Sequence, residues 1–260
     1  MYQDKEMPFL EHLEEFRNRI IKALVGLIVG ALLCLIFSKQ LLLVLMWPSS
    51  HVKIPMDIQV LKVQGMFMVT LEVAFFGGIL VSLPFILYQI WMFIAPGLYN
   101  HERRYVPRII FSATLLFLAG VAFAYFLIIP FALNFFLGLA PTTIKTNIAI
   151  DFYISFIIRL LFVFGIIFEL PILSYFLSKM GILSPEIMRK YRRHAIVVIF
   201  ILGAIFTPPD PFTQIMLAIP LILLYEFSIF ISAWVKKGKI EKARMEMESE
   251  ESTAITEKES

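Results

Sequence analysis

The sequence predicts an all-α membrane protein with six transmembrane helices, and three observations lead to this prediction. The chain has 260 residues, of which 59% are hydrophobic, and it includes 26 Phe. A soluble domain of this size cannot hide so much apolar surface from water. The apolar residues are collected in six spans separated by Pro, Gly and Ser, and Lys and Arg gather on one side of these spans.

The six spans differ in length, and proline interrupts several of them. They cover residues 20–37 (or 20–46), 67–93, 106–130, 153–178, 195–206 and 212–234. Prolines lie in or near them at positions 84, 130, 171 and 220. Each proline removes a backbone donor, so we expect kinked helices. The fifth span would give about 18 Å of helix against a hydrocarbon core of about 30 Å, which predicts a short final helix pair.

The distribution of Lys and Arg predicts the orientation of the chain in the membrane. The N-terminal segment, the second and fourth loops and the C-terminal tail hold 17 of the 23 basic residues, whereas the other three loops hold four. Because basic loops remain in the cytoplasm, both termini are predicted to be cytoplasmic. An odd number of spans would destroy this alternation, so the charges support six spans independently of hydropathy.

The two ends of the chain are predicted to differ from the spans. Residues 8–19 carry apolar side chains at helical spacing and begin with Pro8, which indicates an amphipathic helix lying on the cytoplasmic membrane surface. From Lys236 onward the chain is polar and lacks apolar periodicity, so we expect it to be disordered. Residues 1–235 are therefore interpreted as one transmembrane domain and residues 236–260 as a cytoplasmic tail.

Ionisable residues inside the spans cost roughly 3 kcal/mol each, so their positions need an explanation. Lys22 lies just inside the cytoplasmic end of the first span, where its stem allows the charge to reach the surface. Glu72 and Arg159 lie at similar depth, and we expect them to pair or, alternatively, to extend outward. Glu169 lies deepest, next to a proline, and we interpret it as functional. For Glu226, functional and structural roles are equally supported.

The sequence does not contain an arrangement of residues that is typical of catalysis. The four histidines lie near the ends of different spans, and none has the spacing of a metal ligand. We find no glycine-rich phosphate loop and no serine in a G-x-S-x-G turn. We therefore predict that the protein is not an enzyme and needs neither a metal nor a cofactor.

Five motifs follow one another along most of the chain. They are EHLEEFRNR at 11–19, YQIWMFIAPGLYNHERR at 88–104, FxxGxxFxY at 117–125, FGxxFELP at 164–171, and TPPD at 207–210 with LYE at 224–226. In these motifs and their order the chain resembles the TatC family, the receptor subunits of twin-arginine protein translocases. The resemblance implies six helices with cytoplasmic termini in the inner membrane of a bacterium or archaeon.

The resemblance implies that the protein binds folded cargo through an N-terminal signal with two adjacent arginines. A guanidinium offers a planar fork that matches a carboxylate, and the resemblance assigns this role to Glu15 and Glu102. Arg17 and Arg19 would orient these carboxylates or bind lipid headgroups. The residues alone leave a simpler alternative, in which Glu15 pairs with Arg19 at i, i+4 and Glu102 pairs with Arg103 or its neighbours.

The resemblance also implies contacts inside the membrane. The apolar part of the signal would lie along a curved wall that includes Phe93. The polar positions expected to face this wall or partner helices are Tyr125, Glu169, Asp210, Gln214 and Glu226. The implied partners are single-span proteins similar to TatA and TatB, twin-arginine signal peptides, the lipid bilayer and other copies of the chain. The proton-motive force would supply the energy, and no nucleic acid is expected.

Two other classes of function remain as alternatives. A secondary transporter of a small solute would also contain buried charges and broken helices, but it predicts internal repeats, which the sequence does not show. An insertase-like scaffold would bind partners that need no arginine pair. A comparison of Arg-Arg with Lys-Lys peptides separates the receptor from both.

Overall fold

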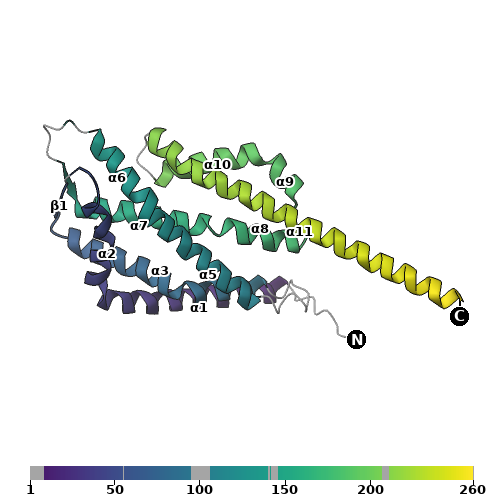
Figure 1. The fold of residues 1–260 in the computed structure, drawn as a ribbon. Helices are drawn as coiled ribbons and strands as arrows, with labels where there is room; N and C mark the ends of the chain where they lie inside the picture. Colours follow the sequence, from purple (N-terminus) through teal and green to yellow (C-terminus); the bar gives the residue numbers. More distant parts are fainter. Residues whose placement is uncertain are drawn as a thin grey trace. The chain divides into compact units, whose positions relative to one another are not determined.

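The computed structural model describes residues 9–54, 56–94, 106–139, 141, 146–206 and 211–259, and most of them are helical (Figure 1). The chain forms two compact units, Met1–Phe168 and Glu169–Ser260. The first unit contains α1 (Phe9–Ile36), α2 (Ser38–Ser50), β1 (Asp57–Gln59), α3 (Gly65–Ile94), α5 (Val106–Phe123), the π-helix η2 (Ala124–Ile128), α6 (Ile129–Gly138), β2 (Asn147–Ala149) and α7 (Ile150–Ile167). The second contains α8 (Leu170–Lys179), α9 (Pro185–Lys190), α10 (Arg192–Phe206) and α11 (Pro211–Glu259).

Helices α1 and α3 form an antiparallel pair (Figure 1). Glycine residues on both helices allow them to approach closely. A Cβ atom added at Gly30 would lie 2.8 Å from the carbonyl oxygen of Gly78, and one added at Gly78 would lie 2.5 Å from the backbone nitrogen of Ala31. The two backbones therefore touch at this level, which only residues without a Cβ permit. This close approach fixes which side chains of α1 and α3 meet further along the pair.

The core of the first unit is built around α7. This helix packs against α3 and α5, and Ile154, Ile157 and Phe164 have no exposed surface. Phe164 also closes on α5, because a Cβ added at Gly120 would lie 2.5 Å from its carbonyl oxygen. As an apolar helix that is buried on most of its surface, α7 is the central helix against which the neighbouring helices of this unit pack.

A short parallel sheet connects two loops of the first unit. Strands β1 and β2 pair in the register Asp57↔Asn147 to Gln59↔Ala149. Beside the sheet, Lys62 Nζ donates to Asp151 Oδ2 at 2.8 Å, which ties the loop before α3 to the first turn of α7. These strands could not be predicted from the sequence, because three residues are too few to show an alternating pattern.

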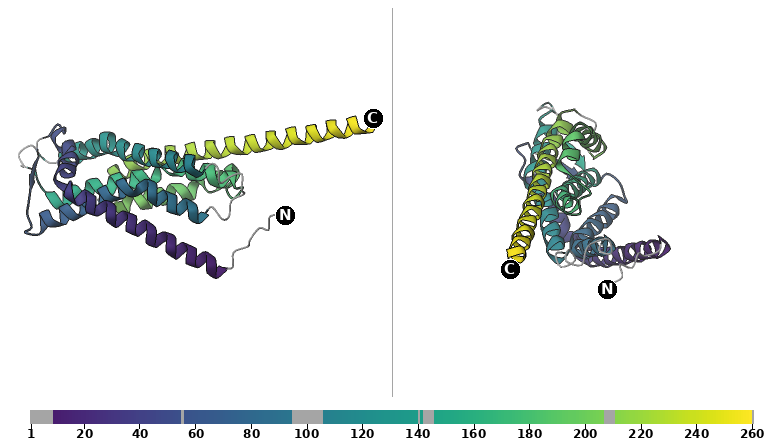
Figure 2. Two further views of the ribbon diagram at one scale, coloured as in Figure 1. Left: turned by 90° about the horizontal axis from the view of Figure 1, so that it is seen from below. Right: turned by 90° about the vertical axis from the view of Figure 1, so that its right-hand side faces the viewer.

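In the second unit, α11 packs against α8, α9 and α10. Ser178 and Ser232 share a hydrogen bond of 2.6 Å in the buried contact between α8 and α11. Tyr225 on α11 donates to the carbonyl oxygen of Met188 on α9 at 2.9 Å. The C-terminal half of α11 extends beyond the other helices of this unit as a single helix (Figures 1 and 2).

An ion pair between α9 and α11 gives a pH-dependent prediction. Lys236 Nζ lies 2.9 Å from Glu186 Oε1, and this hydrogen bond holds the pKa of the Glu186 carboxyl below its ordinary value of 4.5. A carboxyl with a lowered folded-state pKa stabilises the fold above its ordinary pKa, and this contribution is lost as the pH falls through the folded-state pKa. We expect Glu186→Gln to speed hydrogen exchange in α9 slightly at pH 7 and to make no difference below the folded-state pKa. A difference that persists unchanged in acid would contradict this.

The structure contains five helices that are long and apolar enough to cross a membrane, counted over the described residues. They are Leu13–Ile36, Gly65–Ile94, Val106–Gly138, Ile150–Lys179 and Leu217–Glu241. These five correspond to predicted spans one to four and six. The fifth predicted span forms α10, a helix of 15 residues, and it falls below the length required for this set. The mostly helical membrane architecture is thus confirmed, whereas a sixth crossing remains a prediction.

Proline affects the helices at two of the four predicted positions. The helix from Val106 to Gly138 passes through a π-turn just before Pro130, and the helix from Ile150 to Lys179 is interrupted at Phe168 and Glu169, just before Pro171. Pro84 and Pro220 lie inside α3 and α11, which continue through them. Pro130 and Pro171 occupy the first turn of α6 and α8, where a missing N–H costs little.

The structure departs from the expectations at both ends of the chain. Residues 9–19 are not a separate helix, because α1 runs without a break from Phe9 to Ile36. Residues 236–259 are helical, whereas the sequence analysis expected disorder. This segment has no proline, and its single glycine, Gly238, is followed by many Ala, Met, Lys and Glu, which favour helix. The i, i+4 ion pair of Arg244 and Glu248, at 2.9 Å, adds further helical stabilisation.

Candidate functional site

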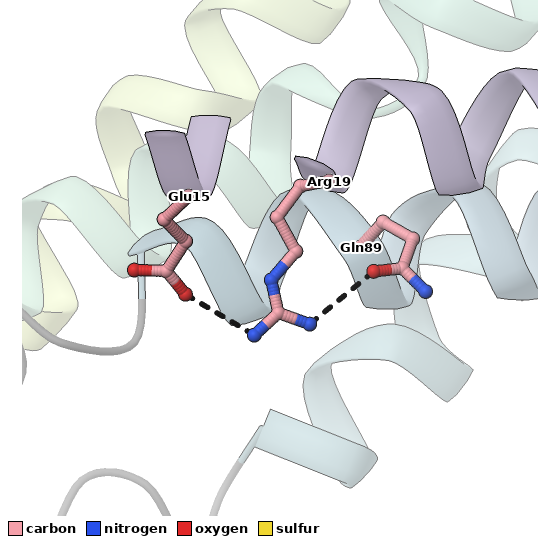
Figure 3. A network of polar contacts seen from close by, with 3 residues as sticks. All are labelled: Glu15, Arg19 and Gln89. Atoms are coloured by element: carbon pink, nitrogen blue, oxygen red, sulfur yellow. Dashed lines mark hydrogen bonds and ion pairs between the residues drawn. The ribbon is translucent and has the colours of Figure 1, made fainter. Parts of the chain in front are cut away.

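A polar cluster lies where the first turns of α1 meet the last turns of α3. Glu15 and Arg19 belong to α1, and Gln89 belongs to α3 (Figure 3). Arg19 Nη2 donates to Glu15 Oε1 at 3.1 Å, and Arg19 Nη1 donates to Gln89 Oε1 at 3.3 Å. The guanidinium of Arg19 therefore lies between the two acceptors and uses both ends of its planar fork (Figure 3).

The sequence places these side chains together in two steps. Glu15 and Arg19 are four residues apart, so they lie on the same face of α1, one turn from each other. Gln89 is brought to this face because α1 and α3 run antiparallel in close contact. Gln89 is nearly fully buried, with 4% of its surface exposed, and an uncharged side chain that accepts a charged donor is suited to such a position.

The carboxylate of Glu15 is only half used. Its Oε1 accepts from Arg19, whereas its Oε2 is buried and has no hydrogen-bond partner among the residues that the structure describes. The side chains of Arg19 and Glu15 are 20% and 19% exposed. A carboxylate oxygen shielded from water without a donor costs free energy, so the site favours a ligand that brings an N–H group.

The other predicted signal-binding residues have different outcomes. The ring of Phe93 lies 5.1 Å from that of Phe16, centroid to centroid, so an aromatic contact adjoins the polar cluster along the same two helices. Arg17 is exposed. Glu102 lies outside the described residues. The simpler alternative for Glu15 is also seen, since it does pair with Arg19 at i, i+4, but with one oxygen only.

Gln89 is the member of this cluster to which the sequence analysis gave no role. It lies in the second motif, between Tyr88 and Ile90, and it is a polar residue in an otherwise apolar stretch of α3. That pattern alone identifies a residue that needs a partner. It does not identify Arg19 as the partner, because this depends on the packing of α1 against α3.

Two of the predicted polar positions inside the membrane, Tyr125 and Gln214, each bond to backbone. Tyr125 donates to the carbonyl oxygen of Val44 at 2.6 Å, and Gln214 donates to the carbonyl oxygen of Phe200 at 2.8 Å. These two side chains thus hold backbone within their own units. Asp210 lies outside the described residues.

The two predicted intramembrane carboxylates, Glu226 and Glu169, differ in their partners. Glu226 Oε1 lies 2.7 Å from Arg192 Nε, so it forms an ion pair between α11 and α10. Glu169 lies at the interruption between α7 and α8, and its Oε1 is buried without a hydrogen-bond partner among the described residues. Of the two, only Glu169 retains an unused acceptor.

The predicted pairing of Glu72 with Arg159 is wrong. Glu72 Oε2 instead accepts a hydrogen bond of 2.7 Å from Ser155 Oγ, and Arg159 is exposed. Ser155 lies one helical turn before Arg159 on α7. Glu72 therefore meets the expected face of this helix, but one turn, about 5.4 Å, from the predicted position. Glu72 thus accepts a hydrogen bond from a neutral donor, Ser155, instead of from Arg159.

Comparison with known proteins identifies the family. The family model described as Sec-independent protein translocase protein (TatC) matches residues 11–220. The TatC protein of Aquifex aeolicus is 39% identical over 241 residues, which cover 91% of this chain and 100% of the relative. The TatC protein of Escherichia coli (strain K12) is 37% identical over 246 residues, which cover 92% of this chain and 93% of the relative.

A solved structure has the same fold. The crystal structure of the twin-arginine translocase receptor TatC superposes with a TM-score of 0.81 at 37% sequence identity, and the match covers 86% of this chain and 99% of that chain. These relatives are translocase proteins, which does not support the alternative of a secondary transporter. The family model and the relatives match most of the sequence, and the chain belongs to the TatC family of Sec-independent protein translocase proteins.

Proposed function

We propose that this protein is the receptor and core subunit of a twin-arginine export system, and that it binds the Arg-Arg signal of folded cargo at Glu15. The observation that carries the proposal is the unpartnered Oε2 of Glu15, buried beside a carboxylate oxygen that Arg19 already occupies. The solved relative is itself described as a twin-arginine translocase receptor. An incoming guanidinium would supply the missing donor.

The geometry explains why Arg19 need not be displaced. Gln89 holds one end of the Arg19 guanidinium, so Arg19 fixes one oxygen of Glu15 and directs the other toward the signal. Glu102 would supply the second carboxylate for the second arginine, and the exposed Arg17 would bind lipid headgroups. Phe93, in contact with Phe16, would meet the apolar part of the signal.

The proposal includes the arrangement of the chain in the membrane. Six crossings, with α10 as the short fifth one, place both termini in the cytoplasm, as the positions of Lys and Arg indicate. The first turns of α1, where Leu10 and Leu13 are 74% and 47% exposed, then lie at the cytoplasmic surface of the inner membrane. This position would place Glu15 on the side of the membrane from which signal peptides arrive.

Partners of this receptor are expected to be membrane helices. The exposed apolar side chains of α10, among them Val197, Ile201 and Ile205, offer a surface for lipid or for single-span proteins similar to TatA and TatB. Other copies of the chain would assemble through similar faces. The proton-motive force is the energy source that the resemblance to this translocase family implies.

The test is the binding of a labelled signal peptide to the purified protein in mild detergent. An Arg-Arg peptide and a Lys-Lys peptide of otherwise identical sequence are compared. We expect the Arg-Arg peptide to bind more tightly, because an ammonium group is a point charge and cannot use a planar carboxylate in the same way. Equal affinity for the two peptides would refute recognition of an arginine pair.

Glu169 is proposed to act after signal binding. It lies far along the chain from the Glu15 cluster, and its unused buried oxygen needs a polar partner that the described part of the protein does not supply. We expect Glu169→Ala to leave signal-peptide affinity unchanged and to reduce export of a folded reporter at least several-fold. Glu169→Gln, which keeps a hydrogen-bonding group, should retain more export. Full export by Glu169→Ala would contradict this role.

A further inference from the structure

A groove runs along one side of the α1–α3 pair and has a charged residue, Lys22, at one end. It has a volume of about 430 Å³ and is bordered on α1 by positions from Ile21 to Leu33 and on α3 by Val81, Ser82 and Phe85. Ser82 donates its hydroxyl to the carbonyl oxygen of Gly78 within its own helix. Apart from Ser82 and Lys22, all residues that line the groove are apolar.

Lys22 differs from the basic residue that precedes it on the same helix. Arg19 is engaged by Glu15 and Gln89, whereas Lys22 is exposed and has no ion-pair partner among the described residues. An ammonium group at the end of an apolar groove fits a ligand with an acidic head and an apolar tail. Ser82 is the second polar residue of the lining, and its hydroxyl proton is already donated to the carbonyl oxygen of Gly78.

The length of the groove matches a lipid acyl chain better than a helix that crosses the membrane. From Lys22 to Leu33 is eleven residues, or about 16 Å along the axis of α1. Half of a hydrocarbon core of about 30 Å is about 15 Å, so the groove spans one leaflet. A partner helix that crosses the membrane would need a groove of twice this length. The volume also lies within the range of about 300–1,000 Å³ that is typical of sites for single small ligands.

We propose that this groove binds one anionic phospholipid, with its phosphate at Lys22 and an acyl chain along Val25, Val29 and Phe85. That the lipid comes from the cytoplasmic leaflet rests on the proposed orientation of the chain. Val25 and Val29 are 54% and 52% exposed and form the outer edge of the groove, so they would contact the acyl chain. The lipid fills a space that water cannot occupy favourably, because its walls offer few hydrogen-bond partners.

The opposite side of the same helix pair provides a matched control. A second groove of about 300 Å³ lies there, and Ile28 borders it, but all of its lining side chains are apolar. Val29→Trp fills the first groove and Ile28→Trp fills the second. The two positions are adjacent on α1 and similarly exposed, at 52% and 57%, so we expect the two variants to have comparable effects on folding.

The experiment is native mass spectrometry of the delipidated, purified full chain with added lipid. Phosphatidylglycerol, phosphatidylcholine and diacylglycerol with the same acyl chains are compared. We expect phosphatidylglycerol to be retained best and diacylglycerol least. Lys22→Gln should weaken phosphatidylglycerol binding about fivefold, as expected for one Lys near an anionic headgroup, and remove its advantage over phosphatidylcholine. Val29→Trp should weaken binding of all three lipids, and Ile28→Trp should bind phosphatidylglycerol as the wild type does.

Three results would overturn the proposal. The first is an unchanged lipid profile in Lys22→Gln, and the second is equal effects of Val29→Trp and Ile28→Trp. The third is a mass showing that the wild type binds a second copy or a single-span protein and that Val29→Trp loses it. Val25→Trp fills the same groove and replaces Val29→Trp if that variant does not yield folded protein. Because lipid retention is measured without signal peptide, failure here leaves the receptor proposal intact, and failure of Arg-Arg recognition leaves this result intact.

Discussion

Glu15→Ala is expected to remove the preference for an Arg-Arg over a Lys-Lys signal and to weaken Arg-Arg binding roughly 10- to 150-fold. The range corresponds to about 1.5–3 kcal/mol for a hydrogen bond to a charged group. Ala removes both the acceptor for the incoming arginine and the partner of Arg19. The Arg19 guanidinium then retains Gln89 alone and places an uncompensated positive charge next to the signal, which adds repulsion to the lost contact.

The neighbouring Glu14 provides the control for this prediction. It is exposed and has no ion-pair partner among the described residues, so Glu14→Ala removes the same charge one residue away and should leave the peptide preference intact. Gln89→Leu should have an intermediate effect, since Glu15 keeps both oxygens but Arg19 loses its anchor on α3. Titration with fluorescent peptide measures all three variants. Equal losses in Glu14→Ala and Glu15→Ala would show that general negative charge, rather than the Glu15 carboxylate, attracts the signal.

The helices of this protein could be predicted well where hydropathy alone decides them. The expected span 67–93 corresponds to α3 at Gly65–Ile94, within two residues at each end. The expected span 106–130 is too short, because the helix continues to Gly138. The expected span ended at Pro130, but this proline lies in the first turn of α6 after a π-turn, where its missing N–H costs little.

Contacts between helices could be predicted less well than the helices themselves. Glu72 and Arg159 were placed at similar depth by counting from the ends of their spans, and span ends read from sequence are uncertain by about one turn. An error of this size explains why Arg159 was predicted as the partner of Glu72, whereas the structure shows Ser155. The pair of Glu15 and Arg19 was available as an alternative because it is local in sequence, whereas the role of Gln89 depends on how α1 and α3 pack.

Gly78→Ala is expected to destabilise the protein by about 2 kcal/mol, although Ala is a better helix former than Gly. The added Cβ would lie 2.5 Å from the backbone nitrogen of Ala31 and 2.7 Å from its Cα, so α1 itself must move. Overpacking of this kind costs about 1–3 kcal/mol, and contact with backbone rather than with a flexible side chain places it in the upper part of that range. The gain in helix propensity, about 1 kcal/mol, offsets only part of this cost.

Gly26→Ala is the control for Gly78→Ala. Comparing the two variants tests whether the packing of α1 on α3 supports the signal site. Its added Cβ would meet the ring of Phe85 at 2.5 Å, but this ring is 43% exposed and can rotate away, so stability should change little. Thermal unfolding in detergent measures both variants. Gly78→Ala should also weaken Arg-Arg binding, because displacing α1 lengthens the contact between Arg19 and Gln89, whereas Gly26→Ala should not. If Gly78→Ala lowers stability but keeps full peptide preference, Arg19 orients Glu15 without help from α3, and the role assigned to Gln89 is wrong.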